Sequence, residues 1–592
     1  MKTTDRRSFV SMLVAAPALG LAILAGDADG AEIPVPGFRP DLVPTQDQIW
    51  SWVKKVNTDF GPQRLTGDKN HIAYVDWLEE QFKALGCSVQ RDHYTFKRWE
   101  ADMVKGIGAT LSVNGATSKL DVLSYFPYSG TTSESGPVSG RLIYIPVTSI
   151  GGSGGAAQAL ADAPPADLAD CVVAIESPCP LQLPGLAPPT VYGTYPADIE
   201  LEGPYKSPLF QLAAGLTDVF KVLDGKCKGI LFCWTDVSND AARYQYVPFG
   251  PPLHNTPGLW LGRDTAAKLK AAAASGGKVT MELRATISPN SPTDSLIAIL
   301  PGSTSEIITV GTHTDGTNIN EENGGIGLLA LAKYAAALPV SSRKRTLAFI
   351  MATGHMCSGP LTDKTTCVGP NGQPGPGADG AGVYRDHPEI VGKTVAALGI
   401  EHLGAMQWKD DAAGMVYHPT HAPTTDIWFI GSADSGSQVP DAASQVMARA
   451  TLAAAQGVPP DGLRMEVVKN GKRSPETSAP VRLGIPSMGL IPLPAYLLEA
   501  SPTGAIERLS SALFYTQVRI LTKLLVTIDT LTTEQIQGKV PVEGASLNPS
   551  APLNGGRHAE MGVAIPGGGK AMLPAFAVAS LLSLRLRRLD DE

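Results

Sequence analysis

The sequence predicts an α/β protein with a mostly parallel, mixed sheet, helices on both faces, and a second, smaller α/β domain inserted into it. Two observations predict this class. Apolar, β-branched segments alternate with helical segments through residues 294–525, which is typical of a parallel sheet covered by helices. From about residue 136 to residue 285 the segments are shorter and broken by Gly and Pro, which indicates the inserted domain.

The composition fits a soluble globular protein of more than one domain. The chain has 592 residues, of which 43% are hydrophobic and 18% are charged. The formal net charge of −8 argues against a nucleic-acid partner, because nucleic-acid binding favours a basic face.

Residues 1–31 predict an export signal. Arg6 and Arg7 precede an apolar stretch, Phe9–Ala25, that ends among small residues. The arginine pair resembles a bacterial twin-arginine signal, and an ordinary secretory signal or an uncleaved anchor is the alternative. We therefore expect an extracytoplasmic protein that is periplasmic, secreted or held at the cell surface.

The N-terminal part of the main domain, residues 32–130, contains two predicted helices and a strand. The helices are Thr45–Val56 and Asn70–Leu85, and apolar residues recur at helical spacing in the second. Gly86 is a helix stop, and Cys87–Phe96 then alternates as a strand does.

The predicted insert, residues 131–288, has short strands and two helices. The expected strands are 140–146, 171–175, 229–235 and 278–285, and the expected helices are 210–223 and 264–274.

The main α/β domain covers residues 289–530. Its expected strands are 295–300, 306–310, 346–352, 394–401, 425–431 and 487–490, and its expected helices are 325–338, 442–456 and 506–527.

Seven cysteines fit an extracytoplasmic protein. Three pairs are close enough in sequence to be bridged, and Cys87 is then left over; the pairs are Cys171 with Cys179, Cys227 with Cys233, and Cys357 with Cys367. The sequence does not fix this connectivity.

Residues 531–592 form a Pro- and Gly-rich linker and a tail. The tail has a Gly run, a short apolar stretch and then three arginines, and the apolar stretch is short for a membrane span. It resembles the sorting signals of bacterial surface proteins, which implies anchoring at the membrane or cell surface. A frayed amphipathic helix is the alternative.

The most informative motif is Ile307–Gly325. A β-branched run leads into His313 and Asp315, and a loop with Glu321 and Glu322 precedes a Gly pair that opens a helix. This order places an imidazole and carboxylates at the carboxyl end of a buried strand, where open α/β sheets bind ligands.

This motif and the segment Gly61–Phe96 resemble the co-catalytic zinc aminopeptidases of peptidase clan MH. Residues 170–177, 228–234 and 257–285 resemble a protease-associated domain inserted into such enzymes. The resemblance implies that His313 is a metal ligand, that Asp315 orients it, and that Glu322 and Glu401 replace two ligand aspartates. His402 is expected on the opposite face from Glu401.

The resemblance is incomplete at the remaining positions. His355 stands where the catalytic Glu belongs, and Met356 stands where a ligand carboxylate belongs. The last ligand should be a late His, but Glu499 or Tyr496 falls closest to its place. An ordinary dinuclear site is therefore not expected, and the prediction for zinc is one ion or none.

The predicted function is an exported, metal-dependent hydrolase of the aminopeptidase type that acts on a peptide or related amide. Its divergent site then holds a single ion, with His355 and Asp315 as the catalytic residues and His313, Glu322 and Glu401 as the metal ligands. The alternative is a catalytically inactive relative that serves as a binding or surface-displayed module.

Overall fold

The computed structural model describes residues 35–542, except for 148–154, 156–157, 161–166, 180, 183–190, 198, 200–204, 210–215, 249–252, 358–365, 376–379, 412, 433–440, 460–461 and 470–475. The predicted export signal and the C-terminal tail from residue 543 lie outside these residues. Among the described helices, none combines the length and apolar character needed to cross a membrane.

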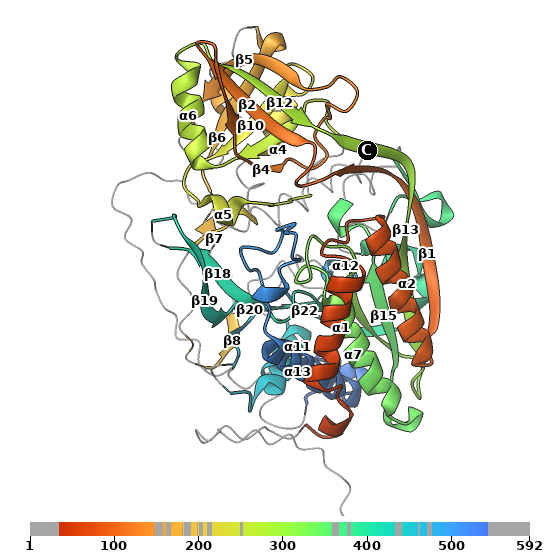
Figure 1. Ribbon diagram of the computed structural model, residues 1–592. Coiled ribbons are helices and arrows are strands. Elements are labelled where there is room, and N and C mark those ends of the chain that lie inside the picture. The colour runs from red at the N-terminus through yellow and green to blue at the C-terminus, as the bar shows by residue number, and fades with distance from the viewer. Residues whose placement is uncertain are drawn as a thin grey trace, which may run out of the picture.

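The larger sheet is mixed, with a parallel centre (Figure 1). Strands β15, β14, β17 and β22 run parallel, and the flanking β13 and β20 are antiparallel to their inner neighbours. In spatial order its strands are β16 (Cys367–Val368), β1 (Ser88–Ala101), β13 (Ala285–Leu300), β15 (Thr346–Ala352), β14 (Ile307–His313), β17 (Thr394–Ile400), β22 (Ser487–Leu490), β20 (Asp426–Gly431), β21 (Met465–Lys469) and β8 (Val191–Tyr195).

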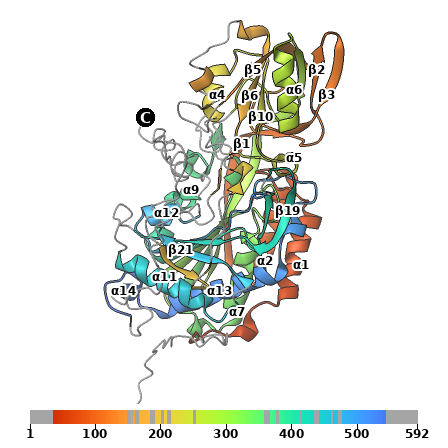
Figure 2. The ribbon, with the colours of Figure 1, turned by 90° about the vertical axis from the view of Figure 1, so that its left-hand side faces the viewer.

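Helices cover both faces of this sheet (Figure 2). The main core lies under α1 (Gln46–Asp59), α2 (Lys69–Ala84), α7 (Gly324–Ala337), α11 (Ala442–Ala455) and α13 (Ser511–Thr530). A smaller core on the other face lies under α9 (Ala381–Asp386), α10 (Pro388–Val391) and α12 (Ser478–Arg482). The predicted fold class is confirmed.

A second sheet forms the smaller body at the top of Figure 1. In spatial order its strands are β3 (Ala116–Leu120), β2 (Ile107–Val113), β12 (Lys278–Leu283), β5 (Val138–Ile145), β6 (Cys171–Ser177), β10 (Gly229–Trp234), β11 (Gly258–Leu261) and β4 (Val122–Tyr125). Helix α6 (Arg263–Ala273) packs on one face, and α4 (Leu216–Leu223) and α5 (Asn239–Ala242) pack on the other.

A long two-stranded ribbon joins the two bodies. Strands β1 and β13 pair antiparallel from Ser88 opposite Ile299 to Ala101 opposite Ala285, with one irregularity between Phe96 and Arg98. The chain thus enters the smaller body after residue 101 and leaves it before residue 285. Residues 107–125, which the sequence analysis assigns to the N-terminal part of the main domain, form strands β2 to β4 of the smaller sheet. Strand β8, within the predicted insert, pairs with β21 of the larger sheet.

The expected disulfide pairs are wrong: all seven cysteines lie among the described residues, and no disulfide joins any of them. For Cys227 and Cys233 the reason is the strand geometry. Cys233 packs in the core beneath α6, whereas Cys227 packs in the core on the opposite face of the same sheet.

Candidate metal centre

Imidazole and carboxylate side chains converge at the carboxyl ends of β14, β15 and β17. His313 is the last residue of β14, His355 follows β15, and Glu401 and His402 follow β17. The loop between β14 and α7 adds Glu321. All five side chains are buried, and two overlapping groups have ligand atoms within 4.8 Å of one another: His313 with Glu321 and His355, and His313 with Glu401 and His402.

Two of the histidines are oriented as metal ligands usually are. Nδ1 of His313 lies 2.8 Å from the main-chain oxygen of Asp315, and Nδ1 of His402 lies 2.7 Å from that of Pro492. Each carbonyl fixes the proton on Nδ1 and leaves the lone pair on Nε2. Neither Nε2 atom has a hydrogen-bond partner among the described residues.

His402 reaches this site through an unusual backbone conformation. Its φ is +56°, which is uncommon for a residue with a side chain. Asn323 holds the turn by accepting a hydrogen bond from the Leu403 N–H at 2.7 Å, and Gln517 accepts one from the Gly404 N–H at 2.7 Å. The expectation that His402 faces away from Glu401 is wrong, because the strand ends at Ile400 and its alternation does not continue into the turn.

Glu401 is a buried carboxylate whose ionised form is unfavourable without a cation. It is only 1% exposed, and neither carboxylate oxygen accepts a hydrogen bond from any described residue. Burial raises the pKa of its carboxyl well above the usual range. Nε2 of His402 lies 3.3 Å from Oε2, but the neutral imidazole gives the carboxylate no opposite charge. A carboxylate buried in this way is stable only when it is protonated or faces a cation.

Glu321 lies between two histidines. Its Oε1 is 3.5 Å from Nε2 of His355, and its Oε2 is 3.4 Å from Nε2 of His402. Burial and the neighbouring Glu401 raise the pKa of Glu321 well above its usual range. Burial, His355 and His402 lower the pKa of His313 well below its usual range, and burial lowers that of His402 to about 3. The neutral imidazoles are therefore available as ligands.

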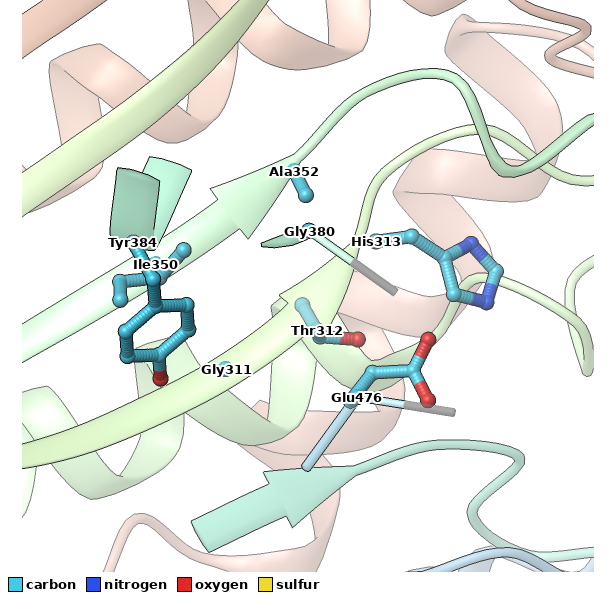
Figure 3. Close-up of a pocket in the computed structure, with 8 residues that line it drawn as sticks. All are labelled: Gly311, Thr312, His313, Ile350, Ala352, Gly380, Tyr384 and Glu476. Atoms are coloured by element: carbon cyan, nitrogen blue, oxygen red, sulfur yellow. The ribbon is translucent and has the colours of Figure 1, made fainter. Parts of the chain in front are cut away.

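His355 connects this cluster to a further carboxylate. Its ring stacks on that of His313, with 4.0 Å between centroids and 10° between planes. Its Nδ1 lies 3.9 Å from Oε1 of Glu476, which precedes α12. Glu476 is buried beside His313 (Figure 3).

Asp315 holds His313 through its main-chain oxygen, and its carboxylate has a different role. That carboxylate accepts hydrogen bonds from the N–H groups of Gly354 at 3.1 Å, His355 at 3.3 Å and Met356 at 2.8 Å. Asp315 thereby fixes the turn after β15, which carries His355.

Glu322 belongs to neither of the two ligand groups, although the resemblance implies that it replaces a ligand aspartate. Its Oε1 forms an ion pair with Arg64, and both side chains are fully buried. Burial raises the pKa of Glu322 to about 7 against the opposing effect of Arg64. Its neighbour Glu321 takes the position beside the histidines.

The two positions suggested for a late ligand also lie outside the groups. Glu499 forms an ion pair with Arg508, and the Tyr496 hydroxyl donates to the main-chain oxygen of Arg508 at 3.0 Å. Met356 packs with Val247 and Leu498 in an apolar cluster. Sequence reasoning missed His402, Glu321 and Glu476 as site residues.

The donor atoms present fit a zinc ion. Imidazole nitrogens and carboxylate oxygens are usual zinc ligands, and the buried atoms without hydrogen-bond partners are the atoms that would bind it. His313, Glu401 and His402 together make the two-histidine, one-glutamate set that catalytic zinc sites use.

Comparison with known proteins gives matches among solved structures only. No protein-family model matches the sequence, and no curated protein matches it. A peptidase M28 precursor from Shewanella amazonensis SB2B aligns over 82% of this chain and 93% of its own, at 16% identity and a TM-score of 0.56.

Two aminopeptidases align over similar lengths. The aminopeptidase from Aneurinibacillus sp. strain AM-1 covers 81% of this chain and 93% of its own, at 14% identity and a TM-score of 0.50. BSAP, a zinc aminopeptidase from Bacillus subtilis, covers 83% of this chain and 98% of its own, at 13% identity and a TM-score of 0.50. The chain has the fold of the zinc aminopeptidases. At these identities the comparisons establish architecture, and the chemistry must be argued from the site.

Proposed function

We propose that this protein is a metal-dependent hydrolase of the aminopeptidase type, with one zinc ion held by His313, Glu401 and His402. One observation carries the proposal. The two Nε2 atoms and the Glu401 carboxylate are buried together without hydrogen-bond partners among the described residues. Buried polar atoms are rarely left in this state unless a ligand satisfies them.

A single ion follows from the role of His313. Both ligand groups require this residue, and its Nδ1 already faces the Asp315 carbonyl. The remaining Nε2 can bind one ion. Among the residues that the structure describes, the other ligand group would offer a second ion Glu321 and His355, and the two ions would repel each other at the short distance that dinuclear sites require.

Zinc bound here would lower the pKa of a water molecule and polarise a substrate carbonyl. Glu321 is placed to accept the proton of that water, because its oxygens lie 3.4–3.5 Å from the His402 and His355 nitrogens. Nε2 of His355 lies 3.5 Å from Oε1 of Glu321, and we assign His355 to pass a proton to the leaving amine. Asp315 acts on the reaction indirectly, by fixing the turn that carries His355.

The experiment is a metal analysis of protein purified without added zinc, combined with hydrolysis of a panel of amino-acid amides. We expect about one zinc per chain, and turnover that a chelator abolishes. His402→Ala should lose both the metal and the activity, whereas His93→Ala, at an exposed position, should lose neither.

Two zinc ions per chain would contradict the single site. Metal-free protein without turnover would support the alternative function, a binding or surface-displayed module. The apolar packing of Met356, in a position where the resemblance expects a ligand, favours that alternative.

We further propose that the chain is exported through its arginine pair, and that its C-terminal tail attaches it to the membrane or cell surface. Replacing Arg6 and Arg7 by lysine should leave the protein in the cytoplasmic fraction of its bacterial host. Removing residues 566–592 should release it from the membrane fraction while metal content stays the same.

A further inference from the structure

The turn that carries His355 is held at both of its ends. Residues His355–Cys357 form a single turn of 3-10 helix after β15. In so short a helix the first N–H groups and the last carbonyl groups have no partner inside the helix. The larger body satisfies the N–H end, because the Asp315 carboxylate accepts hydrogen bonds from three successive N–H groups there.

The smaller body satisfies the carbonyl end of the same turn. The hydroxyl of Tyr128, in the segment between β4 and β5, donates a hydrogen bond to the main-chain oxygen of Met356. Both residues are 1% exposed, so water does not compete for this bond. Burial raises the pKa of the Tyr128 phenol well above its usual range, so the hydroxyl keeps its proton and remains the donor.

The segment that carries Tyr128 is fixed by its own contacts. Tyr128 has a φ of +61°, a conformation that a residue with a side chain adopts only when its surroundings impose it. The His254 N–H donates to its main-chain oxygen at 2.8 Å, and Trp99 packs edge-on against its ring with 5.9 Å between centroids. A Cβ atom at the nearby Gly130 would lie 2.0 Å from the main-chain oxygen of Asn255. These contacts hold the Tyr128 hydroxyl in one place at the boundary between the two bodies.

We propose that Tyr128 is a positioning residue for His355, through which the smaller body fixes the place of the imidazole. The proposal rests on the proposed function, in which His355 passes a proton to the leaving amine. When the amide C–N bond breaks, its electron pair stays on the nitrogen. That nitrogen takes the proton that Glu321 removed from the attacking water and that His355 passes on. The hydroxyl group of the water stays on the carbonyl carbon, so the step needs no further reactant.

This proton transfer depends on where the turn holds the imidazole. Nε2 of His355 lies 3.5 Å from Oε1 of Glu321, which is already longer than a usual hydrogen bond. A small shift of the turn therefore interrupts the path of the proton. Removing the Tyr128 hydroxyl would leave the buried Met356 oxygen without its donor, and the turn would have to shift or admit water to satisfy that oxygen.

The experiment compares Tyr128→Phe with Tyr125→Phe. Tyr125 is a matched control, because it is also 1% exposed and packs edge-on against the same Trp99 ring. Its hydroxyl likewise donates to a main-chain oxygen, that of Ala101 at 2.9 Å, which is not part of the turn. Each variant loses one hydroxyl and keeps the ring. Thermal unfolding checks that both fold, and we expect similar unfolding temperatures for the two.

The first measurement is hydrolysis of the amide and of the p-nitroanilide of one amino acid, the one whose amide the wild type hydrolyses fastest. The amide has a basic leaving group that must be protonated, whereas p-nitroaniline leaves with less help. Tyr128→Phe should lower kcat by about tenfold for the amide and by about threefold or less for the p-nitroanilide, with KM and zinc content unchanged. Tyr125→Phe should keep the wild-type ratio of the two kcat values. An equal fall for both substrates in Tyr128→Phe would overturn the proposal.

A double variant separates positioning from general support of the fold. His355→Gln should lower amide turnover by itself, and a residue that acts through His355 has nothing left to position in that variant. Adding Tyr128→Phe to His355→Gln should therefore change kcat for the amide by less than about twofold. A further fall of about tenfold would mean that Tyr128 acts through another group, which contradicts the proposal.

Hydrogen exchange tests the contact without turnover. In Tyr128→Phe the amides of residues 354–357 should exchange at least about ten times faster than in the wild type, because the turn opens more often. Tyr125→Phe should leave these rates unchanged. Wild-type exchange rates in Tyr128→Phe would mean that the Tyr128 hydroxyl does not hold the turn.

The two proposals fail in distinguishable ways. Faster exchange in Tyr128→Phe, without hydrolysis of either substrate by the wild type, would reject the hydrolase and keep Tyr128 as the residue that holds this turn. Zinc-dependent hydrolysis with wild-type kinetics in Tyr128→Phe would keep the hydrolase and reject the positioning role.

Discussion

Glu401 is a buried residue whose charge depends on what occupies the site. Without a cation its two unpartnered oxygens make the ionised form unfavourable, and with a cation they become ligands. Glu401→Gln should therefore have opposite effects on stability in the two states. In chelator, the variant should unfold at a higher temperature, by an amount equivalent to about 1–3 kcal/mol. In zinc, the wild type should be the more stable protein, because it alone gains the binding energy.

Thermal unfolding, measured once with chelator and once with a tenfold excess of zinc, gives the change in stability caused by Glu401→Gln in each state. Glu466→Gln serves as the control, because it removes a buried carboxylate outside the ligand groups and should respond equally in both conditions. If zinc stabilises Glu401→Gln as much as the wild type, Glu401 is not a ligand.

Glu322 should behave differently from Glu401 because its partner is Arg64 and not the histidines. Glu322→Gln is expected to leave the zinc content unchanged. Arg64→Met should lower the free energy of unfolding by about 3–5 kcal/mol, because it leaves the carboxylate buried without its partner. Metal analysis and denaturant unfolding test the pair, and zinc loss in Glu322→Gln would restore Glu322 as a ligand.

The site residues that sequence reasoning missed lie in turns and loops, outside helices and strands, so neither helical nor strand periodicity predicts where their side chains point. Glu321 and Glu322 are neighbours in a turn, where strand alternation does not decide which one faces the histidines. His402 follows the end of β17 with a positive φ, so its direction depends on Asn323 and Gln517 and not on the strand. Glu476 lies far along the chain from the metal-site histidines, in a segment without a recognisable motif.

At the scale of elements, the contact between α7 and the sheet fixes the position of the metal loop, the segment 314–323 between β14 and α7. The first residue of α7, Gly324, packs so closely that an added Cβ would lie 2.0 Å from Oγ1 of Thr312 and 2.2 Å from the main-chain oxygen of Ile400. Gly324→Ala must therefore push the helix away from β14 and β17. We expect a loss of at least about 1–3 kcal/mol in unfolding free energy and weaker zinc binding.

Gly108→Ala on β2 is the matched control, because an added Cβ there meets no atom within 4 Å. Denaturant unfolding should show little change for this variant. An equal loss in both variants would mean that the effect comes from the backbone and not from the packing of α7.

Elements with a strong apolar pattern were predictable, and those defined by pairing partners were not. The predicted bounds of β15 and β22 match the structure. The predicted helix 506–527 begins later, because Ser510 caps α13 by accepting a hydrogen bond from the Leu513 N–H. The hairpin of β18 (Met406–Asp410) and β19 (Tyr417–Pro423) was missed, since its residues are mostly half-exposed and alternate weakly.

At the scale of the whole molecule, the smaller body supports the loops around the site. The Tyr246 N–H donates to the oxygen of Leu498 at 2.7 Å, and the Ala500 N–H donates to that of Tyr244 at 2.8 Å. On its other side the same loop accepts hydrogen bonds from Asn318, which belongs to the metal loop. The insert thus helps to hold the loops of the candidate site in place through these hydrogen bonds.

A second support runs from the sheet to the turn that carries His402. Asp426 on β20 accepts hydrogen bonds from Nε2 of Gln517 at 2.8 and 2.9 Å, and Gln517 in turn holds Gly404. Burial raises the pKa of Asp426 to about 7, and the same cause raises that of Glu466 on β21 to about 7. Two buried acids in this sheet therefore bind protons in the folded state at a pH where the unfolded chain has released them.

This arrangement predicts how stability depends on pH. Between about pH 4 and pH 7 these two carboxyls bind more protons in the folded protein than in the unfolded chain, so their contribution to the free energy of unfolding should fall as the pH rises through this window. For Asp426 the shift from 3.8 to about 7 corresponds to at most about 4 kcal/mol. Denaturant unfolding in chelator, measured across this range, should show a shallower decline for Asp426→Asn than for the wild type. Glu466→Gln should also flatten the curve, and the double variant should flatten it most. Parallel curves for all four proteins would mean that these two carboxyls ionise normally in the folded state.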